Sequence, residues 1–222
     1  MASCVTDMRY RAPVAVAFAI ALALAAVPHG ALAAATPPAQ GGIRIEFEQL
    51  TEQPGKVLLQ QAVITEQDAR GNVLKTIRAD RAESNGLDVS NSTWTFTGEV
   101  VVTIPEGELR ADQARVLILK GHISTAAVKG QPANFEQHGG GGTAARASGR
   151  AEDISYDAGS GNLLFTGNVW FRSETTGEVS SSRATYNIPQ RISSFEGGGG
   201  QRVRGTILTK PLPASGEPDR TP

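Results

Sequence analysis

The sequence has almost no cysteine, little histidine and no excess of one charge. Among its 222 residues, Cys4 is the only cysteine, there are three histidines, and 21 basic against 22 acidic side chains leave a net charge of -1. A lone thiol excludes a disulfide framework and a thiolate metal site. Balanced charge provides no basic surface for a nucleic acid backbone, so we expect no nucleic acid partner.

Side chains that could perform catalysis are equally sparse. His122 and His138 are 16 positions apart, with no acidic residue at ligand spacing and no evident orienting partner, so we predict solvated surface residues. No serine lies in a G-x-S-x-G motif. Glu152 and Asp153 are adjacent, hence on opposite faces of a strand, and cannot act together on one substrate. We therefore expect no enzymatic activity, no metal and no cofactor.

The amino terminus has the pattern of a secretory signal. Basic residues precede an apolar run at 12–27, and the small residues ALAA follow. Sixteen residues form a helix of about 24 Å, shorter than the hydrocarbon core of about 30 Å, which favours a cleaved signal over a retained anchor. We predict a signal peptide at 1–33, starting at Met1 or Met8, with cleavage between Ala33 and Ala34 or, as second choice, after Ala35.

Beyond the leader, apolar residues recur at period two and not at helical spacing. In TWTFTGEVVVTI at residues 93–104, the apolar side chains are Trp94, Phe96, Val100, Val102 and Ile104, with polar residues between most of them. Such alternation predicts a strand pair, or one long bent strand, with a dry face and a wet face. Gly98 interrupts the row of large side chains without changing its phase, which indicates a bend.

The chain also repeats itself. FTGEV begins at Phe96 and FTGNV at Phe165, 69 positions later, and RAE recurs at the same offset from Arg81 to Arg150. Shared spacing of several landmarks indicates a structural duplication. A finer period places Ala82, Ala114, Ala151 and Ala184 at steps of 32, 37 and 33 residues, each long enough for two strands and their turns. We predict stacked strand pairs in an all-β array.

The duplication also predicts which side chains share a face. Phe96 and Phe165 should point inward and Thr97 and Thr166 outward, whereas Gly98 and Gly167 should mark where the strands bend. Trp170 has the opposite parity to its apolar neighbours and should lie outside.

An ordered series of segments carries a family likeness. The segments are IRIEFE from Ile43, FTGEVVVTIPEGELRADQARVLI from Phe96, GQPANFEQ from Gly130, ASGRAEDISYDAGSGNLLFTGNVWFRSETTGEVSSSRATYNI from Ala147 and GGQRVRGTIL from Gly199. This series resembles the OstA-like domain of the LptA family of periplasmic lipopolysaccharide-transport proteins, over residues 92–208. It departs from the family pattern at 48–77, where VLLQQAVITEQDARGNVLKT is consistent with an additional strand pair.

The resemblance implies a fold, a function and a location. The fold is a twisted, open β-jellyroll, a folded antiparallel sheet at residues 43–208, which here follows a flexible leader at 34–42 and precedes a proline-rich, disordered tail at 209–222. The family binds the lipid A acyl chains of lipopolysaccharide in an apolar interior. It stacks head to tail in the periplasm and bridges an inner-membrane LptC-like component and an outer-membrane LptD-like translocon.

Two sets of candidate residues follow. The predicted lipid-binding residues are Ile45, Trp94, Phe96, Val100, Val102, Leu109, Phe135, Tyr156, Leu163, Phe165, Val169, Phe171 and Val179; ordinary core packing is an equally good interpretation of each. An array with two free ends leaves unpaired strand edges that can accept a partner strand. The predicted partner-edge residues are Ile43, Ile45, Phe47, Val203 and Ile207.

Two alternatives stay open at this stage. One is a structural β-repeat module of the cell envelope with a closed, dry core. The other is an LptC-like component of the same pathway, anchored in the inner membrane by the apolar run at 12–27.

Overall fold

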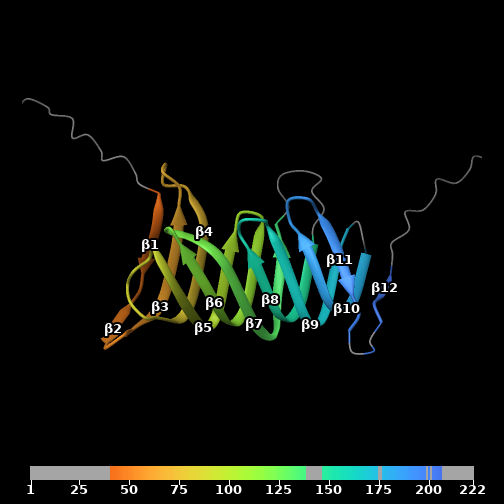
Figure 1. Cartoon of the computed structure of the whole chain (residues 1–222), viewed down its shortest axis with the longest axis horizontal. Coiled ribbons are helices and arrows are strands. Elements are labelled where there is room, and N and C mark those ends of the chain that lie inside the picture. Colours follow the sequence, from red (N-terminus) through yellow and green to blue (C-terminus); the bar gives the residue numbers. More distant parts are fainter. Residues whose placement is uncertain (1–40, 139–146, 175–176, 199, 201, 207–222) are drawn as a thin grey trace, which may run out of the picture. The chain divides into compact units, whose positions relative to one another are not determined.

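The computed structural model describes residues 41–138, 147–174, 177–198, 200 and 202–206. Every helix or strand assigned in these residues is a β-strand (Figure 1). The strands are β1 (Gly42–Glu46), β2 (Gln49–Gln53), β3 (Lys56–Gln67), β4 (Val73–Ser84), β5 (Asn91–Ile104), β6 (Gly107–Leu119), β7 (His122–Gln137), β8 (Ala147–Asp157), β9 (Asn162–Ser173), β10 (Gly177–Asn187), β11 (Ile192–Glu196) and β12 (Arg204–Thr206). The all-β prediction is confirmed, and within these residues no helix is long and apolar enough to cross a membrane.

Some predictions concern other parts of the chain. The signal peptide at 1–33 with its cleavage site at Ala33 and Ala34, nearly all of the leader, Ile207 and the tail at 209–222 lie outside the described residues.

All strands belong to one antiparallel sheet. From β3 to β10, each strand pairs with the strand that follows it in sequence. Both ends of the sheet are built from two short strands, because β1 and β2 pair with different halves of β3, and β12 and β11 pair with different halves of β10. The sheet therefore has two free edges, each broken near its middle, and is open as predicted.

The long strands are bent at a shared line. Their pairing registers shift at successive bulges, between Arg78 and Arg81, Thr97 and Val100, Arg110 and Gln113, Lys129 and Ala133, Arg150 and Asp153, and Ser181 and Arg183. A bulge bends its strand and increases the local twist. Because these bulges lie in neighbouring strands, they form one line across the sheet, which we call the fold line.

The open sheet folds over along the fold line, so that its two halves form two facing layers. Strands in a sheet are about 4.8 Å apart, so β3 and β7, four strands apart, would be separated by about 19 Å in a flat sheet. Yet the carboxylate of Glu66 on β3 lies 3.0 Å from the ring of His122 on β7. The turns at Asp68–Asn72 and Pro105–Glu106 lie along one outer border of the folded sheet, the first rim. The turns at 85–90, Lys120–Gly121 and Ala158–Gly161 lie along the other, the second rim, and the seam is the line where the rims meet.

The two copies of the repeated pentapeptide form the same bend. Gly98 and Gly167 have φ values of 79° and 80°, and the residues after them, Glu99 and Asn168, are also left-handed. Phe96 and Phe165 are fully buried. On the opposite face, Thr166 is exposed and Thr97 half-buried. The predicted inward phenylalanines and bend-forming glycines are confirmed, and the TWTFTGEVVVTI segment is one bent strand, β5.

The segment that departs from the family pattern joins the same sheet. VLLQQAVITEQ lies in β3, and the residues after the turn lie in β4, so the predicted extra strand pair is confirmed. Its inward residues Leu59, Ile64 and Ile77 are fully buried. The short strand β2 beside it was not predicted, because QLTEQ has only one large apolar side chain.

Candidate functional site

The interior between the two layers contains nearly all of the predicted lipid-binding residues. Trp94, Phe96, Val100, Val102, Leu109, Phe135, Tyr156, Leu163, Phe165, Val169, Phe171 and Val179 are all 7% exposed or less, whereas Ile45 is half-buried and packs against this core. Since alternate residues of each strand point to one face, the fold brings them into a single apolar interior. In this conformation, protein side chains fill that interior.

Rings from both layers pack together in the carboxyl-terminal half. The centroid of Phe171 lies 5.9 Å from Phe165, 5.1 Å from Tyr186 and 5.6 Å from Phe195, and Phe135 lies 6.2 Å from Phe165. Edge-to-face and tilted rings at these separations attract one another beyond their burial. Tyr186 and Phe195 were absent from the prediction, although both share the inward parity of their strands.

Glycine makes room for these rings. A β-carbon at Gly149, on β8, would lie 2.5 Å from an atom of the Phe165 ring. Gly149 has an ordinary strand conformation, so its backbone angles do not require glycine. The close approach of the Phe165 ring does, because any β-carbon would collide with it.

The amino-terminal half of the interior is mostly aliphatic, with Trp94 and Phe96 on β5 as its large aromatic side chains. The residues VLIL at 116–119 had no predicted face, and the structure places Val116 and Ile118 inside while Leu119 is 43% exposed. Ile123 and Ile154 are also fully buried here. These side chains continue the apolar surface from the aromatic half towards β3.

Glu66 is a charged exception to the apolar interior. Its side chain is 2% exposed, and it is the only charged side chain among the buried residues that the structure describes. Its carboxylate accepts hydrogen bonds from the Lys75 Nζ at 2.9 Å and the backbone nitrogen of Ile123 at 3.0 Å, and lies 3.0 Å from the His122 Nδ1. Burial acts to raise the pKa of Glu66, but these hydrogen bonds and the charge of Lys75 outweigh it and hold the pKa below its ordinary value.

The prediction that His122 lacks an orienting partner was wrong. Its ring is 63% exposed, yet one nitrogen faces Glu66, which is 56 positions away in sequence. Spacing along the chain carries no signal for this contact, because only the closure of the two layers produces it.

A second polar contact crosses the seam. The Tyr186 hydroxyl, on β10, donates to the Gln137 Oε1, on β7, at 2.8 Å. Burial raises the pKa of Tyr186, so this phenol is a neutral donor at physiological pH. Tyr156, whose pKa burial and the nearby Glu106, Asp157 and Glu66 charges raise to about 12, is neutral as well.

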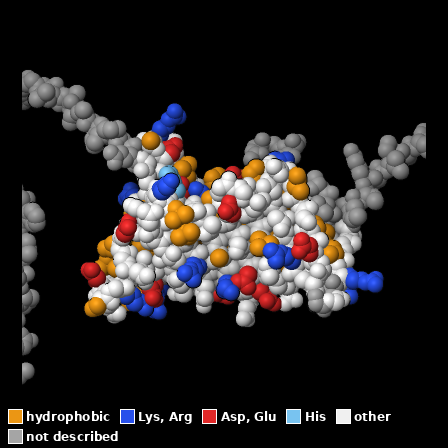
Figure 2. Space-filling view, viewed as in Figure 1, with side chains coloured by type: hydrophobic (Ala, Val, Ile, Leu, Met, Phe, Trp, Pro, Cys, Tyr) orange, Lys and Arg blue, Asp and Glu red, His pale blue; other side chains and the backbone are white. Residues whose placement is uncertain are grey.

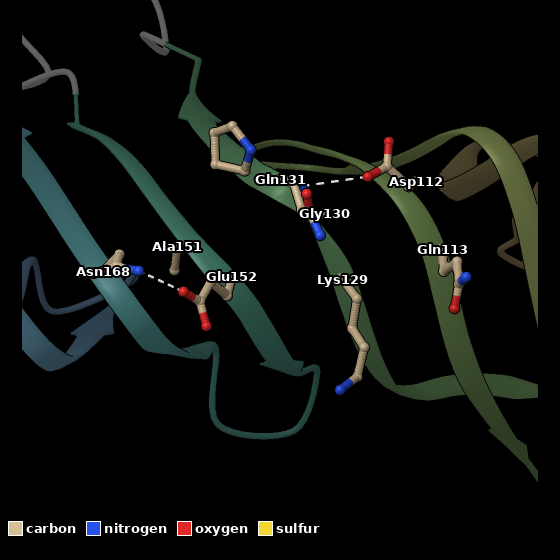
Figure 3. Close-up of a pocket in the computed structure, with 9 residues that line it drawn as sticks. Asp112, Gln113, Lys129, Gly130, Gln131, Ala151, Glu152 and Asn168 are labelled. Carbon is tan, nitrogen blue, oxygen red and sulfur yellow. Dashed lines mark hydrogen bonds between the residues drawn. The ribbon is translucent and has the colours of Figure 1, made fainter.

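The fold line carries a polar cleft on the outside of the sheet. The cleft has a volume of about 580 Å³ and lies where β6, β7, β8 and β9 separate at their bulges (Figure 3). In it, the backbone nitrogen of Gln131 donates to Asp112, and the amide of Asn168 donates to Glu152 (Figure 3). These side chains satisfy polar groups at the bends, and they lie on the opposite face from the interior.

The outer surface seen in Figure 2 is mixed in charge. Basic and acidic side chains are scattered over this face, with small hydrophobic groups between them and without a large area of one sign. Trp170 points to the outer face of the sheet, as predicted from its parity, with the guanidinium of Arg150 4.5 Å from the ring centroid.

The partner-edge residues that the structure describes lie in the edge strand β1 or directly beside β1 and β12. Ile43 and Ile45 on β1 are half-buried against the core, while Phe47 is 43% exposed and Val203 is 42% exposed. The structure adds β2 and β11 to these edges, and Ile192 on β11 is 61% exposed.

These features define a class of protein: an open antiparallel sheet, folded along a line of bulges, with an apolar interior between its layers. The family model described as LptA/(LptD N-terminal domain) LPS transport protein matches residues 76–192, more than half of the chain. The chain therefore belongs to this lipopolysaccharide-transport family.

The crystal structure of LptH, described as the LptA homologous periplasmic component of the conserved lipopolysaccharide transport device from Pseudomonas aeruginosa, is similar with 14% identity and a TM-score of 0.46. The alignment covers 79% of this chain and 100% of that chain. No curated protein matches this sequence.

Proposed function

We propose that this protein carries lipopolysaccharide across the periplasm by holding the lipid A acyl chains between its two layers. The apolar interior is the observation that supports this most directly, because it extends from the aliphatic side chains on β3 to the aromatic rings that pack against Phe195 on β11. Each methylene removed from water is worth about 0.8 kcal/mol, so a chain of about a dozen carbons costs about 10 kcal/mol to expose. A carrier that shields these chains removes that cost.

The proposal involves no chemical conversion of the lipid. The family to which the chain belongs is described as a transport family. The secretory pattern at 1–33 is consistent with work in the periplasm, with the signal removed.

We further propose that copies of the chain stack head to tail and connect an inner-membrane LptC-like component to an outer-membrane LptD-like translocon. The directions of the edge strands support this. β1 runs from the first rim towards the fold line, since Gly42 pairs with Gln67 and Glu46 with Val63. β12 runs from the fold line towards the first rim, since Arg204 pairs with Ser180 and Thr206 with Glu178.

Stacked in the same orientation, β12 of one copy and β1 of the next would therefore be antiparallel. The alternation of the sheet would continue from copy to copy, with rims, fold lines and interiors aligned. The two edges differ, so the contact is heterologous and can extend into a filament.

The filled interior favours a second candidate function, a structural envelope module with a closed core. The two candidates differ in whether the interior ever contacts lipid. A photo-reactive phenylalanine analogue placed at Phe96 or Phe165 tests this in folded protein exposed to lipopolysaccharide. Thr95 and Thr166, exposed neighbours on the same strands, are the matched outer-face controls.

Carriage of lipid predicts adducts from the two interior positions and few from the outer ones. Folded protein that yields no adduct from either interior position would refute carriage and leave the structural module. Equal adducts from inner and outer positions would indicate adsorption to the surface and would also refute it.

A further inference from the structure

Glu66 joins the two layers where the interior would have to open. It lies on β3 at the first rim, and the Ile123 nitrogen and His122 ring that face it lie on β7 at the second rim. Lys75 is its register partner on β4 and belongs to the same layer as Glu66. Two of the three contacts with the carboxylate therefore cross the seam.

A buried carboxylate is unusual between two layers of a sheet if those layers only need to pack against each other. Removing an isolated charge from water is costly unless it is paired and hydrogen-bonded. Apolar side chains of similar volume often serve stability as well as a buried ion pair. A polar connection, however, can be exchanged for contacts with water, so it can open and close without exposing apolar surface at the contact itself.

The seam contains one more polar contact of this kind among the residues that the structure describes, from Tyr186 to Gln137. That contact is between neutral groups, whereas the Glu66 contact is charge-assisted, and charge-assisted hydrogen bonds are roughly twice as strong. Of the polar contacts across the seam, the one made by Glu66 is therefore the stronger, and it lies near β3.

We propose that Glu66 and His122 form a gate, with Lys75 as its charge-balancing residue, that holds the seam shut in the empty protein and separates when acyl chains enter between the rims. The inference rests on the proposed carriage of lipid and adds a route of entry and its control. The covered interior agrees with it: residues such as Ile64 and Ile118 are fully buried, so a lipid reaches them only after the layers part.

The test measures the rate at which purified lipopolysaccharide enters the purified protein. Glu66→Gln removes the charge at nearly constant shape, and His122→Ala removes one contact at an exposed position where folding is affected least. Glu83→Gln is the matched control, because Glu83 forms an ion pair with Lys56 on the neighbouring strand at 2.7 Å, within one layer.

We expect entry to accelerate about tenfold in Glu66→Gln, the factor that corresponds to about 1.4 kcal/mol. The acceleration should be smaller in His122→Ala and absent in Glu83→Gln. Binding at the wild-type rate in both gate variants would overturn the gate while leaving lipid carriage intact. Absence of binding by the wild-type protein would instead overturn lipid carriage and this route of entry with it.

A second measurement needs no lipid and tests the gate itself. The amide of Ile123 is protected by its hydrogen bond to Glu66 and exchanges with solvent only when the seam opens. Its hydrogen exchange should be faster in Glu66→Gln and His122→Ala than in the wild type, and unchanged in Glu83→Gln. Unchanged exchange in both gate variants would show that Glu66 does not hold the seam and would overturn the proposal.

Discussion

At the residue scale, two separate constraints require glycine at the left-handed positions 98 and 167 on the fold line. A β-carbon at Gly98 would lie 2.3 Å from the Asp80 carboxylate, and one at Gly167 would lie 2.5 Å from the Glu152 carboxylate. Positive φ disfavours most other residue types. The acidic side chain of the preceding strand closes over each glycine, which explains why the same short motif serves both bends.

Replacing these glycines should destabilise the fold. Gly98→Ala and Gly167→Ala should each lower the free energy of unfolding by about 1–3 kcal/mol, through backbone strain and the displaced carboxylate. Gly86→Ala is the control, because a β-carbon there meets no atom within 4 Å and its backbone is not left-handed. Urea unfolding compares the three variants, and equal stability of Gly98→Ala and Gly86→Ala would contradict this account of the bend.

The buried carboxylate of Glu66 should make stability depend on pH. Its pKa in the folded protein is held below the ordinary value of 4.5, so its charged form favours the folded state. That contribution is fully present above about pH 4.5 and is lost as the pH falls through the lowered pKa.

Unfolding of the wild type and Glu66→Gln at about pH 7 and at about pH 3 tests this directly. Near neutrality the wild type should be more stable by about 2 kcal/mol, the worth of a hydrogen bond to a charged group. The difference should shrink at the acidic pH. A difference that is the same at both values would mean that the carboxylate charge does not contribute.

At the scale of elements, the carboxyl-terminal edge depends on a strand of three residues. β12 pairs with Glu178–Ser180 and covers the half of β10 that β11 leaves free. Without β12, this half of β10 becomes the edge, and β10 runs in the same direction as β1. A stacked copy could then add only in a parallel arrangement, which interrupts the antiparallel alternation.

Ending the chain after Gly200 should therefore weaken self-association, about tenfold or more in the association constant, without unfolding the sheet. A chain that ends after Leu208 retains β12 and is the matched control. Sedimentation over a range of concentrations measures the change, and equal association of the two truncated chains would contradict a role for this edge.

At the scale of the whole molecule, head-to-tail stacking and a symmetric dimer bring different pairs of residues together. Arg44 on β1 and Arg204 on β12 are exposed and lie on the free edges, in the halves next to the first rim. Stacking brings Arg44 of one copy towards Arg204 of the next, whereas a two-fold dimer would bring identical positions together.

Cysteine variants distinguish the two arrangements in a chain that also carries Cys4→Ser. A mixture of the Arg44→Cys and Arg204→Cys proteins should form mixed disulfide dimers on oxidation. Each variant alone should form few. Efficient dimers of Arg44→Cys alone, or no mixed dimers where sedimentation detects oligomers, would contradict head-to-tail stacking.

Much of this architecture follows from the sequence alone, and the reason is that the relevant signals are local. Alternation at period two assigned Trp94, Phe96 and Phe165 to the dry face, because neighbouring side chains of a strand must point to opposite sides. Glycine within an alternating row located the bends, since few other residues adopt a left-handed backbone. The repeat offset then related one half of the sheet to the other.

Only the tertiary structure decided what meets across the seam. Glu66 and His122 are 56 positions apart, and no spacing rule brings them together. Their contact depends on the accumulated bend and twist of the strands between them. The same folding decided that the interior is filled by the protein's own side chains. It also decided that each free edge is built from two short strands, and on β10 the bulge between Ser181 and Arg183 separates the halves that pair with β12 and β11.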